Sequence, residues 1–219
     1  MGSSHYDRHF LESLSALEAL FGDERVQTKS QRLKEIFDHA ELKWQDYIAR
    51  IPDRRVNYLL IAEAPPWSEI GQEIQYVLDP SSRPRTHMRA LRRAFPAASE
   101  MSPEKALAEF ARQRLLIVDS IPFAMKYSSS KRRGRKYEHL VSLTVPALLE
   151  KLESRSFSWS PDLRIAFSVR LNALAVISGL DSKLSLGGRT FPLSSDLIAV
   201  NGAGYPDGRK LRALFGGAE

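Results

Sequence analysis

The stretch Val56-Asn57-Tyr58-Leu59-Leu60-Ile61-Ala62, followed directly by Glu63-Ala64-Pro65-Pro66-Trp67, decides the fold class. Its first part is a short apolar run of strand-forming residues, and the prolines of its second part end that run. A continuous apolar run of this kind is typical of a strand buried on both faces of a parallel sheet. We therefore expect a buried strand over 56–62 that opens into a stiff loop with an acid at its mouth.

Three further apolar runs have the same character, and they lie at 115–118, 163–168 and 196–201. Helical periodicity fills the segments between and after them, at 86–95, 103–112, 144–153, 169–178 and 208–215. Strands that alternate with helices indicate an α/β fold. We expect a three-layer αβα arrangement with a central, mainly parallel, four-stranded sheet.

Two amphipathic helical runs precede the first strand. One covers 9–20 and ends near Gly22, a residue suited to a helix C-cap, and the other runs over 33–48 before Pro52 stops it. We expect residues 1–52 to form a helical extension packed on an α/β core of residues 53–219, all within a single domain of residues 1–219.

The composition is that of an ordinary globular protein, with 219 residues of which 43% are hydrophobic and 26% charged. The chain has no cysteine, which excludes disulfides, thiol catalysis and cysteine-bound zinc or iron–sulfur clusters. It has no apolar run of transmembrane length and no apolar signal-peptide region, so we expect a cytoplasmic protein without a membrane partner. The net charge of +6 favours an anionic partner, nucleic acid before membrane; a basic surface without a polyanion is the alternative.

Several common catalytic motifs are absent from the sequence. It contains no GxxxxGK(S/T) phosphate loop, no HExxH pair and no GxSxG elbow. His39, His87 and His139 are isolated, which is typical of structural or exposed histidines. We expect no metal and no cofactor.

The site should lie beyond the carboxyl ends of the parallel strands, where ligands bind in folds of this class. The segments expected to form the site are therefore residues 63–67, 119–127, 167–170 and 201–207. Glu63, in a loop stiffened by prolines, suits the positioning of a water or of a base edge. The alternative is that Glu63 caps the next helix or pairs with an arginine.

Asp119 follows four apolar residues, so its carboxylate emerges where the sheet opens. An ionised carboxylate only accepts hydrogen bonds. It can accept from the exocyclic amine of cytosine, whereas the carbonyl of uracil at that position is repelled. The alternative is an Asx-type turn in which Asp119 accepts the backbone amides of Ser120 and Ile121.

A basic loop over 128–136 follows, with five positive residues among the six from Lys131 to Lys136 and a tyrosine on each side, Tyr127 and Tyr137. Cations with nearby aromatic rings suit phosphate contacts and base stacking, while a solvated surface is the alternative. We expect this loop to be mobile in the free protein. A second basic cluster consists of Arg83, Arg85, Arg89, Arg92 and Arg93, and the last four fall on one broad helical face. This cluster is either a second contact to the DNA backbone or a solvated helix face.

The fourth strand end, 201–210, carries three glycines that permit close approach of a partner to the backbone. Arg209, Lys210 and Arg212 lie at the start of the last helix, whose amides can hold a phosphate. An ordinary glycine-rich turn into a helix is the alternative.

The order of these four strand-end motifs resembles the uracil-DNA glycosylase superfamily, from about Val56 to Phe215. Residues 60–66 are similar to its first motif, a strand followed by Gly-Glu-Ala-Pro-Gly, and Tyr205-Pro206 falls where the His-Pro of its intercalation loop lies. The chain departs from the family pattern by Ala62 in place of Gly, Asp119 in place of Asn and Tyr205 in place of His.

The resemblance implies a monofunctional, cofactor-free DNA glycosylase that flips a nucleotide and hydrolyses its N-glycosidic bond, on a sheet of uracil-DNA glycosylase type. It implies catalytic roles for Glu63, Glu69 and Asp119. It implies base contacts by Ala64, Pro65, Tyr76 (as the stacking ring), Asp119, Phe123 and Tyr205. It implies DNA contacts by Lys126, Lys131, Arg132, Arg133, Arg135, Ser168, Arg170, Gly204, Pro206 and Arg209.

Asp119 in place of Asn exchanges a donor and an acceptor for acceptors alone, which favours a cytosine-type base. The expected substrate is therefore a modified cytosine in double-stranded DNA, such as glucosylated 5-hydroxymethylcytosine in phage DNA, and antiviral defence is one setting that suits it. The alternatives are a repair glycosylase for uracil or another deaminated base, and a catalytically inactive DNA-binding protein of the same fold. We expect a monomer.

Overall fold

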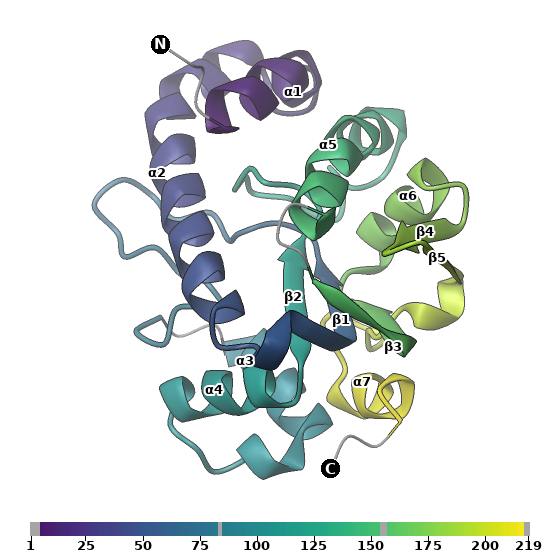
Figure 1. The fold of residues 1–219 in the computed structure, drawn as a ribbon. Coiled ribbons are helices and arrows are strands. Elements are labelled where there is room, and N and C mark those ends of the chain that lie inside the picture. The colour runs from purple at the N-terminus through teal and green to yellow at the C-terminus, as the bar shows by residue number, and fades with distance from the viewer. Residues whose placement is uncertain (1–4, 83–84, 154–156, 217–219) are drawn as a thin grey trace.

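Three parallel strands, in the order β2-β1-β3, form the central sheet (Figure 1). They are β1 (Arg55–Ala62), β2 (Leu115–Asp119) and β3 (Ser158–Phe167). The structure is a computed structural model that describes residues 5–82, 85–153 and 157–216. All three strands coincide with predicted apolar runs, and β1 and β2 are mostly buried, as expected for strands covered on both faces. The chain is thus an α/β protein.

The fourth predicted strand is not part of the sheet. Its first residues form a short 3₁₀ turn, η3 (Ser195–Leu197), which Ser194 caps by accepting the amide of Asp196 at 3.3 Å. Only an isolated parallel bridge between Phe167 and Ile198 continues the order beyond β3. The sheet therefore has three strands and not the expected four, because the turn η3 occupies the beginning of the segment that was predicted to pair.

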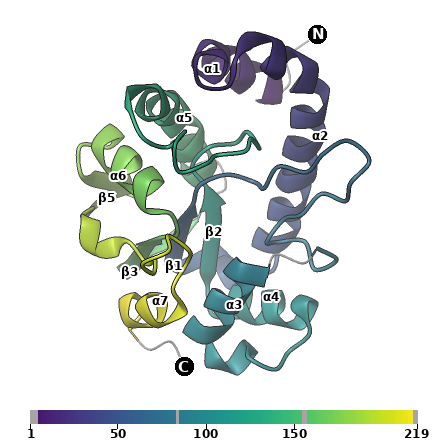
Figure 2. The same cartoon turned by 180° about the vertical axis from the view of Figure 1, so that it is seen from behind.

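The described helices cover both sides of the sheet (Figures 1 and 2). α5 and α6 lie on one side, and α3, α4 and α7 on the other. Their bounds are α1 (His5–Phe21), α2 (Asp23–Ile48), α3 (Arg85–Ala94), α4 (Pro103–Arg112), α5 (Arg135–Glu153), α6 (Arg170–Gly179) and α7 (Gly208–Leu214), with 3₁₀ turns η1 (Pro52–Arg54) and η2 (Pro96–Ala98). α5 begins at Arg135 rather than near 144, so part of the predicted basic loop is helical.

A short antiparallel hairpin that the sequence analysis did not predict follows α6. It consists of β4 (Lys183–Leu186) and β5 (Arg189–Pro192). Gly187 and Gly188 join the strands with φ angles of 55° and 75°, which suit the tight turns of two-residue hairpins. A methyl at Gly187 would lie 2.9 Å from the Trp159 ring, so this turn also packs closely on β3.

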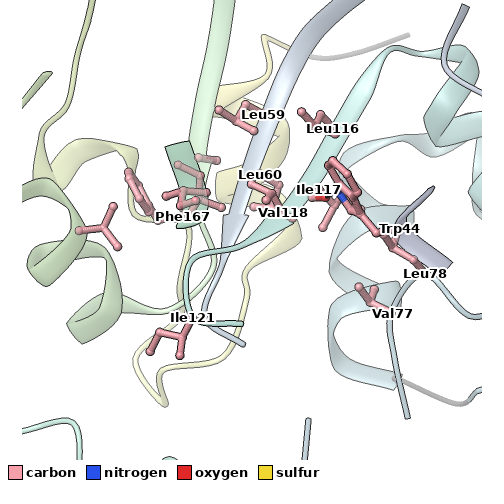
Figure 3. Close-up of a cluster of buried hydrophobic side chains, with 14 of the residues drawn as sticks. Trp44, Leu59, Leu60, Val77, Leu78, Leu116, Ile117, Val118, Ile121 and Phe167 are labelled. Carbon is pink, nitrogen blue, oxygen red and sulfur yellow. Dashed lines mark hydrogen bonds between the residues drawn. The ribbon is translucent and has the colours of Figure 1, made fainter. Parts of the chain in front are cut away.

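α2 protects the exposed edge of β2. The indole of Trp44 donates to the carbonyl of Ile117 at 2.9 Å, and the hydroxyl of Tyr47 donates to the carbonyl of Leu115 at 2.7 Å. Both carbonyls point away from β1, toward the side of β2 that has no neighbouring strand. Without the donors from α2 they would be unpaired, as on an uncovered edge strand. Figure 3 shows Trp44 packed beside the apolar side chains of the sheet. α1 and α2, within the predicted extension of residues 1–52, thus share one core with the sheet.

α1 and α2 meet at Gly22, which has a φ of 93° and donates its amide to the carbonyl of Glu18 at 2.8 Å. This positive φ fits the predicted helix C-cap. In the part of the chain that the structure describes, no helix is long and apolar enough to cross a membrane.

Candidate functional site

The ends of β1 and β2 bring the first two predicted site residues together. Ala62 pairs with Asp119 in the parallel register, so Glu63 and Asp119 emerge from neighbouring strands at the same edge of the sheet. The amides of Ser120 and Ile121 donate to the carbonyls of Ala62 and Glu63 at 3.0 and 2.8 Å. These amides hold the two strand ends together and leave no Asx turn at Asp119.

A cavity of about 440 Å³ opens at this edge, and all four predicted strand-end segments contribute to its lining, together with residues such as Tyr76 and His87. Its walls are mainly apolar, with a few polar groups, which is the composition of small-ligand pockets. We name it the base pocket, after the flipped base that the sequence analysis predicts at this edge. The predicted residues that line it are Glu63, Ala64, Pro65, Tyr76, Asp119, Arg132, Arg170, Gly204, Tyr205 and Pro206.

Glu63 is fully engaged with protein partners on the pocket wall. Arg132 donates from Nε to Oε1 at 2.6 Å and from Nη2 to Oε2 at 2.5 Å, and the hydroxyl of Tyr137 donates to Oε1 at 2.5 Å. Glu63 is 7% exposed, so these donors replace the water that its charge would require. The pairing of Glu63 with an arginine, one of the two readings of this acid, is thus present alongside its place in the pocket.

The electrostatics of this cluster keep Arg132 and Tyr137 as donors. Burial is the largest single effect on Arg132 and lowers its pKa, but the hydrogen bonds and charge of Glu63, with the smaller effect of Tyr137, together outweigh it and leave the pKa raised. Burial and the Glu63 carboxylate raise the pKa of Tyr137 well above its usual value. Arg132 therefore stays charged and Tyr137 stays a neutral donor at neutral pH.

Asp119, which also lines the pocket, is held by Tyr76. The hydroxyl of Tyr76 donates to Oδ2 of Asp119 at 3.0 Å. Burial raises the pKa of Asp119 to about 6, against the opposing effects of Lys151 and of the Tyr76 hydroxyl. Asp119 is therefore mostly an acceptor at pH 7 and becomes a donor in mild acid.

His87, on α3, also lines the pocket, although the sequence analysis expected it to be structural or exposed. Burial lowers its pKa to about 4, so its imidazole is neutral at pH 7. No sequence signal distinguishes this histidine, because its neighbours on α3 are ordinary helix residues. Tyr137 had a weak signal, since it flanks the basic loop, but its bond to Glu63 joins residues 74 apart.

Tyr205 lies at the rim of the pocket on a tight loop. Asn201 builds this loop: its Oδ1 accepts the amides of Ala203 and Tyr205 at 3.0 and 3.1 Å, and its carbonyl accepts the amide of Gly204 at 3.0 Å. Tyr205 itself is 58% exposed. A fixed loop with a projecting ring suits contact with a partner outside the pocket.

Glu69 and Phe123, predicted as a catalytic and a base-contacting residue, do not line the base pocket. Glu69 pairs on the surface with Lys126 at 2.7 Å and Lys29 at 3.3 Å, and these lysines lower its pKa to about 2. Phe123 is fully buried in the core, where its ring meets those of Tyr6 and Phe10 from α1. The structure therefore does not bring Glu69 to the Glu63–Asp119 edge, nor Phe123 to a base.

The predicted DNA-contacting residues are divided between several places. Ser168 is fully buried and Arg209 is exposed at the start of α7, where its amide donates to Asp207 at 2.8 Å. Lys131 donates to the carbonyl of Leu20. In the second basic cluster, Arg92 donates to the carbonyl of Met101 at 2.6 Å, and Arg83 and the side chain of Arg85 lie outside what the structure describes.

Among the residues that the structure describes, no group of three or more His, Asp or Glu side chains is arranged to hold a metal ion. Comparison of the chain with protein-family models, curated proteins and solved structures finds no match.

Proposed function

We propose that the chain is a DNA glycosylase of the uracil-DNA glycosylase type, which flips a modified cytosine into the base pocket and hydrolyses its N-glycosidic bond. The observation that carries this proposal is the convergence of Glu63, Asp119 and Tyr205 on one pocket at the carboxyl ends of the strands. These residues come from three segments far apart in the sequence, and each has a different task in base excision.

Recognition of the base falls to Asp119. Its Oδ2 accepts from Tyr76, so the carboxylate is fixed in orientation and remains an acceptor above pH 6. An acceptor fixed at the pocket wall favours a base with an exocyclic amine over one with a carbonyl. The cavity of about 440 Å³ lies within the range of pockets that enclose small ligands.

Glu63 supplies the negative charge that the reaction needs. Cleavage of an N-glycosidic bond develops positive charge on the sugar, and a nearby carboxylate stabilises that charge or orients the attacking water. In the free protein Arg132 neutralises Glu63, so DNA binding must draw Arg132 away, for example to a phosphate, before the carboxylate can act. Extrusion of the base costs a few kcal/mol, which contacts by Tyr205 and the basic residues offset.

The test is an abasic-site assay on short duplexes that carry cytosine, 5-hydroxymethylcytosine, its glucosylated form, uracil or hypoxanthine. We expect abasic product from a modified cytosine and loss of that product in Glu63→Gln. Asp119→Asn should shift any remaining preference toward uracil. Product from uracil alone would instead support the repair alternative.

The bonds of Glu63 to Arg132 and Tyr137 favour one other candidate, an inactive DNA-binding protein. Under that reading the acid is a structural anchor for the basic loop. Absence of abasic product from every duplex, with DNA binding retained in wild type and in Asp119→Asn, would support this second function over the first.

A further inference from the structure

A second cavity, of about 680 Å³, lies between α5 and α6 beside the base pocket. Arg132 and Leu171 line both cavities, so the two are adjacent at that point. We name the second cavity the α5–α6 groove. Its cationic side chains are Arg132, Arg133 and Arg135, and His139 and Glu138 also line it.

Some side chains of the basic loop bond to other parts of the protein, and others do not. Lys131 and Lys136 donate to the carbonyls of Leu20 and Ala19, in the last turn of α1. Cations stabilise the C-terminal end of a helix, and α1 has no basic residue of its own there. Lys131 therefore connects the basic loop, and Lys136 the first turn of α5, to the end of α1, and neither is free for a ligand.

Arg133 and Arg135 make no such bonds within the described residues. Both are exposed, and within the described residues neither side chain has a hydrogen-bond or ion-pair partner. Arg135 is moreover the first residue of α5, where the helix dipole disfavours a positive side chain. An anion held between the two arginines would remove that unfavourable interaction.

Part of the lining of the groove is apolar. It is made of Leu171, Leu174 and Ala175 of α6, and Leu174 is 41% exposed. Cationic and apolar side chains in one groove match a nucleotide unit, with its phosphate on the arginines and its base or sugar on the leucines. A bare inorganic anion would leave the apolar side chains uncovered.

We propose that the α5–α6 groove is a second DNA-binding site, which holds the strand next to the flipped nucleotide through Arg133 and Arg135. This rests on the proposed function for the position of the flipped nucleotide. It assigns the phosphate contacts to these two arginines and not to Lys131 and Lys136.

The test compares two variants with the same change of charge. Arg133→Glu/Arg135→Glu alters the groove, and Arg50→Glu/Arg55→Glu alters two exposed arginines at the amino end of β1. The affinity for a fluorescein-labelled duplex is measured by anisotropy over a range of salt concentrations. We expect the groove variant to bind at least about tenfold more weakly and to lose about 2 from the slope of log K against log salt, since each phosphate contact contributes about 0.9. The control should change less than about threefold, because salt screens distant charge.

Equal losses in the two variants, or no loss in the groove variant, would overturn the proposal. The melting temperature of each variant shows whether it is folded, and Arg133→Gln/Arg135→Gln replaces the glutamate pair if that pair does not fold. Abasic-site formation is measured on the same duplexes. If the groove variant binds more weakly but no duplex yields abasic product, only the proposed function is contradicted. If abasic product forms but binding does not depend on the groove arginines, only this inference is contradicted.

Discussion

The hydroxyl of Tyr76 donates a 3.0 Å hydrogen bond to Oδ2 of Asp119, across the wall of the base pocket. The expected task of Tyr76 was to stack on a flipped base. Tyr76 is instead 2% exposed, and its hydroxyl orients the Asp119 carboxylate. Tyr76 and Asp119 are thus one hydrogen-bonded unit whose protonation state depends on pH.

Tyr76→Phe should raise the pKa of Asp119 further, because the hydroxyl bond favours the ionised form. In wild type we expect the affinity for a cytosine-type base over a uracil-type base to fall as the pH drops through about 6. In Tyr76→Phe that fall should begin about half a pH unit or more higher. Binding of the two duplexes on both sides of pH 6 measures this, and Asp119→Asn serves as the control because it has no carboxyl to titrate. An unchanged midpoint in Tyr76→Phe would contradict the assignment.

The raised pKa of Asp119 also predicts how stability depends on pH. A carboxyl whose pKa is higher in the folded than in the unfolded chain stabilises fully below its unfolded pKa and loses that stabilisation as the pH rises through about 6. Asp119→Asn should therefore stabilise the protein by about 1–3 kcal/mol more at pH 7 than at pH 4. Urea unfolding at the two pH values measures the difference. The same effect of the substitution at both would show that Asp119 titrates normally.

The three strands of the sheet could be predicted because each contains an apolar run, although β3 begins at Ser158, before its predicted run, in residues that are partly exposed. The segment at 196–201 has similar composition, yet Ser194 and Asp196 turn its beginning into η3. The choice between a strand and a turn here depends on one side-chain cap, which does not alter the hydrophobic pattern of the sequence. The short hairpin at 183–192 was missed for the opposite reason: its Gly187-Gly188 turn is visible in the sequence, but its strands of four residues are too short for a clear pattern.

The location of the site could be predicted for a related reason. Parallel strands end at one edge, so Glu63 and Asp119 had to be neighbours once β1 and β2 paired. Pairing of Glu63 with an arginine was one of the expected alternatives, but Arg132 and Tyr137 could not be singled out as its partners, because they come from a segment whose charge run is typical of a solvated loop. The path of that loop depends on its lysines, which are fastened to the end of α1.

The Glu63–Arg132 pair should behave as a coupled unit. Glu63→Gln and Arg132→Gln should each lower the free energy of unfolding by about 2–3 kcal/mol, because either change leaves a largely buried charge without its partner. The double variant should lose less than the sum, with a coupling of about 1–3 kcal/mol. Urea denaturation of all four proteins closes the cycle. Strict additivity would mean that the two charges are stabilised independently by solvent.

Gly208 allows α7 to pack closely on α3. A methyl at this position would lie 2.5 Å from Cβ of Arg93 and 2.6 Å from the carbonyl oxygen of Ala90. Gly208→Ala should therefore destabilise the fold by about 1–3 kcal/mol, although alanine is the better helix former. Gly202→Ala is the matched control, because no atom lies within 4 Å of its methyl. Thermal melting compares the two, and equal melting temperatures would mean that α7 shifts freely on α3.

Tyr205 should matter for DNA and not for folding. Its ring is 58% exposed, and the loop beneath it is built by Asn201, so Tyr205→Ala should change the free energy of unfolding by less than about 0.5 kcal/mol. The same variant should bind a duplex about tenfold more weakly, because a ring that stacks on a base contributes about 1–3 kcal/mol. Tyr205→Trp keeps a stacking surface and should retain most of the affinity. Anisotropy titration ranks the three proteins, and wild-type affinity in Tyr205→Ala would remove this loop from the DNA interface.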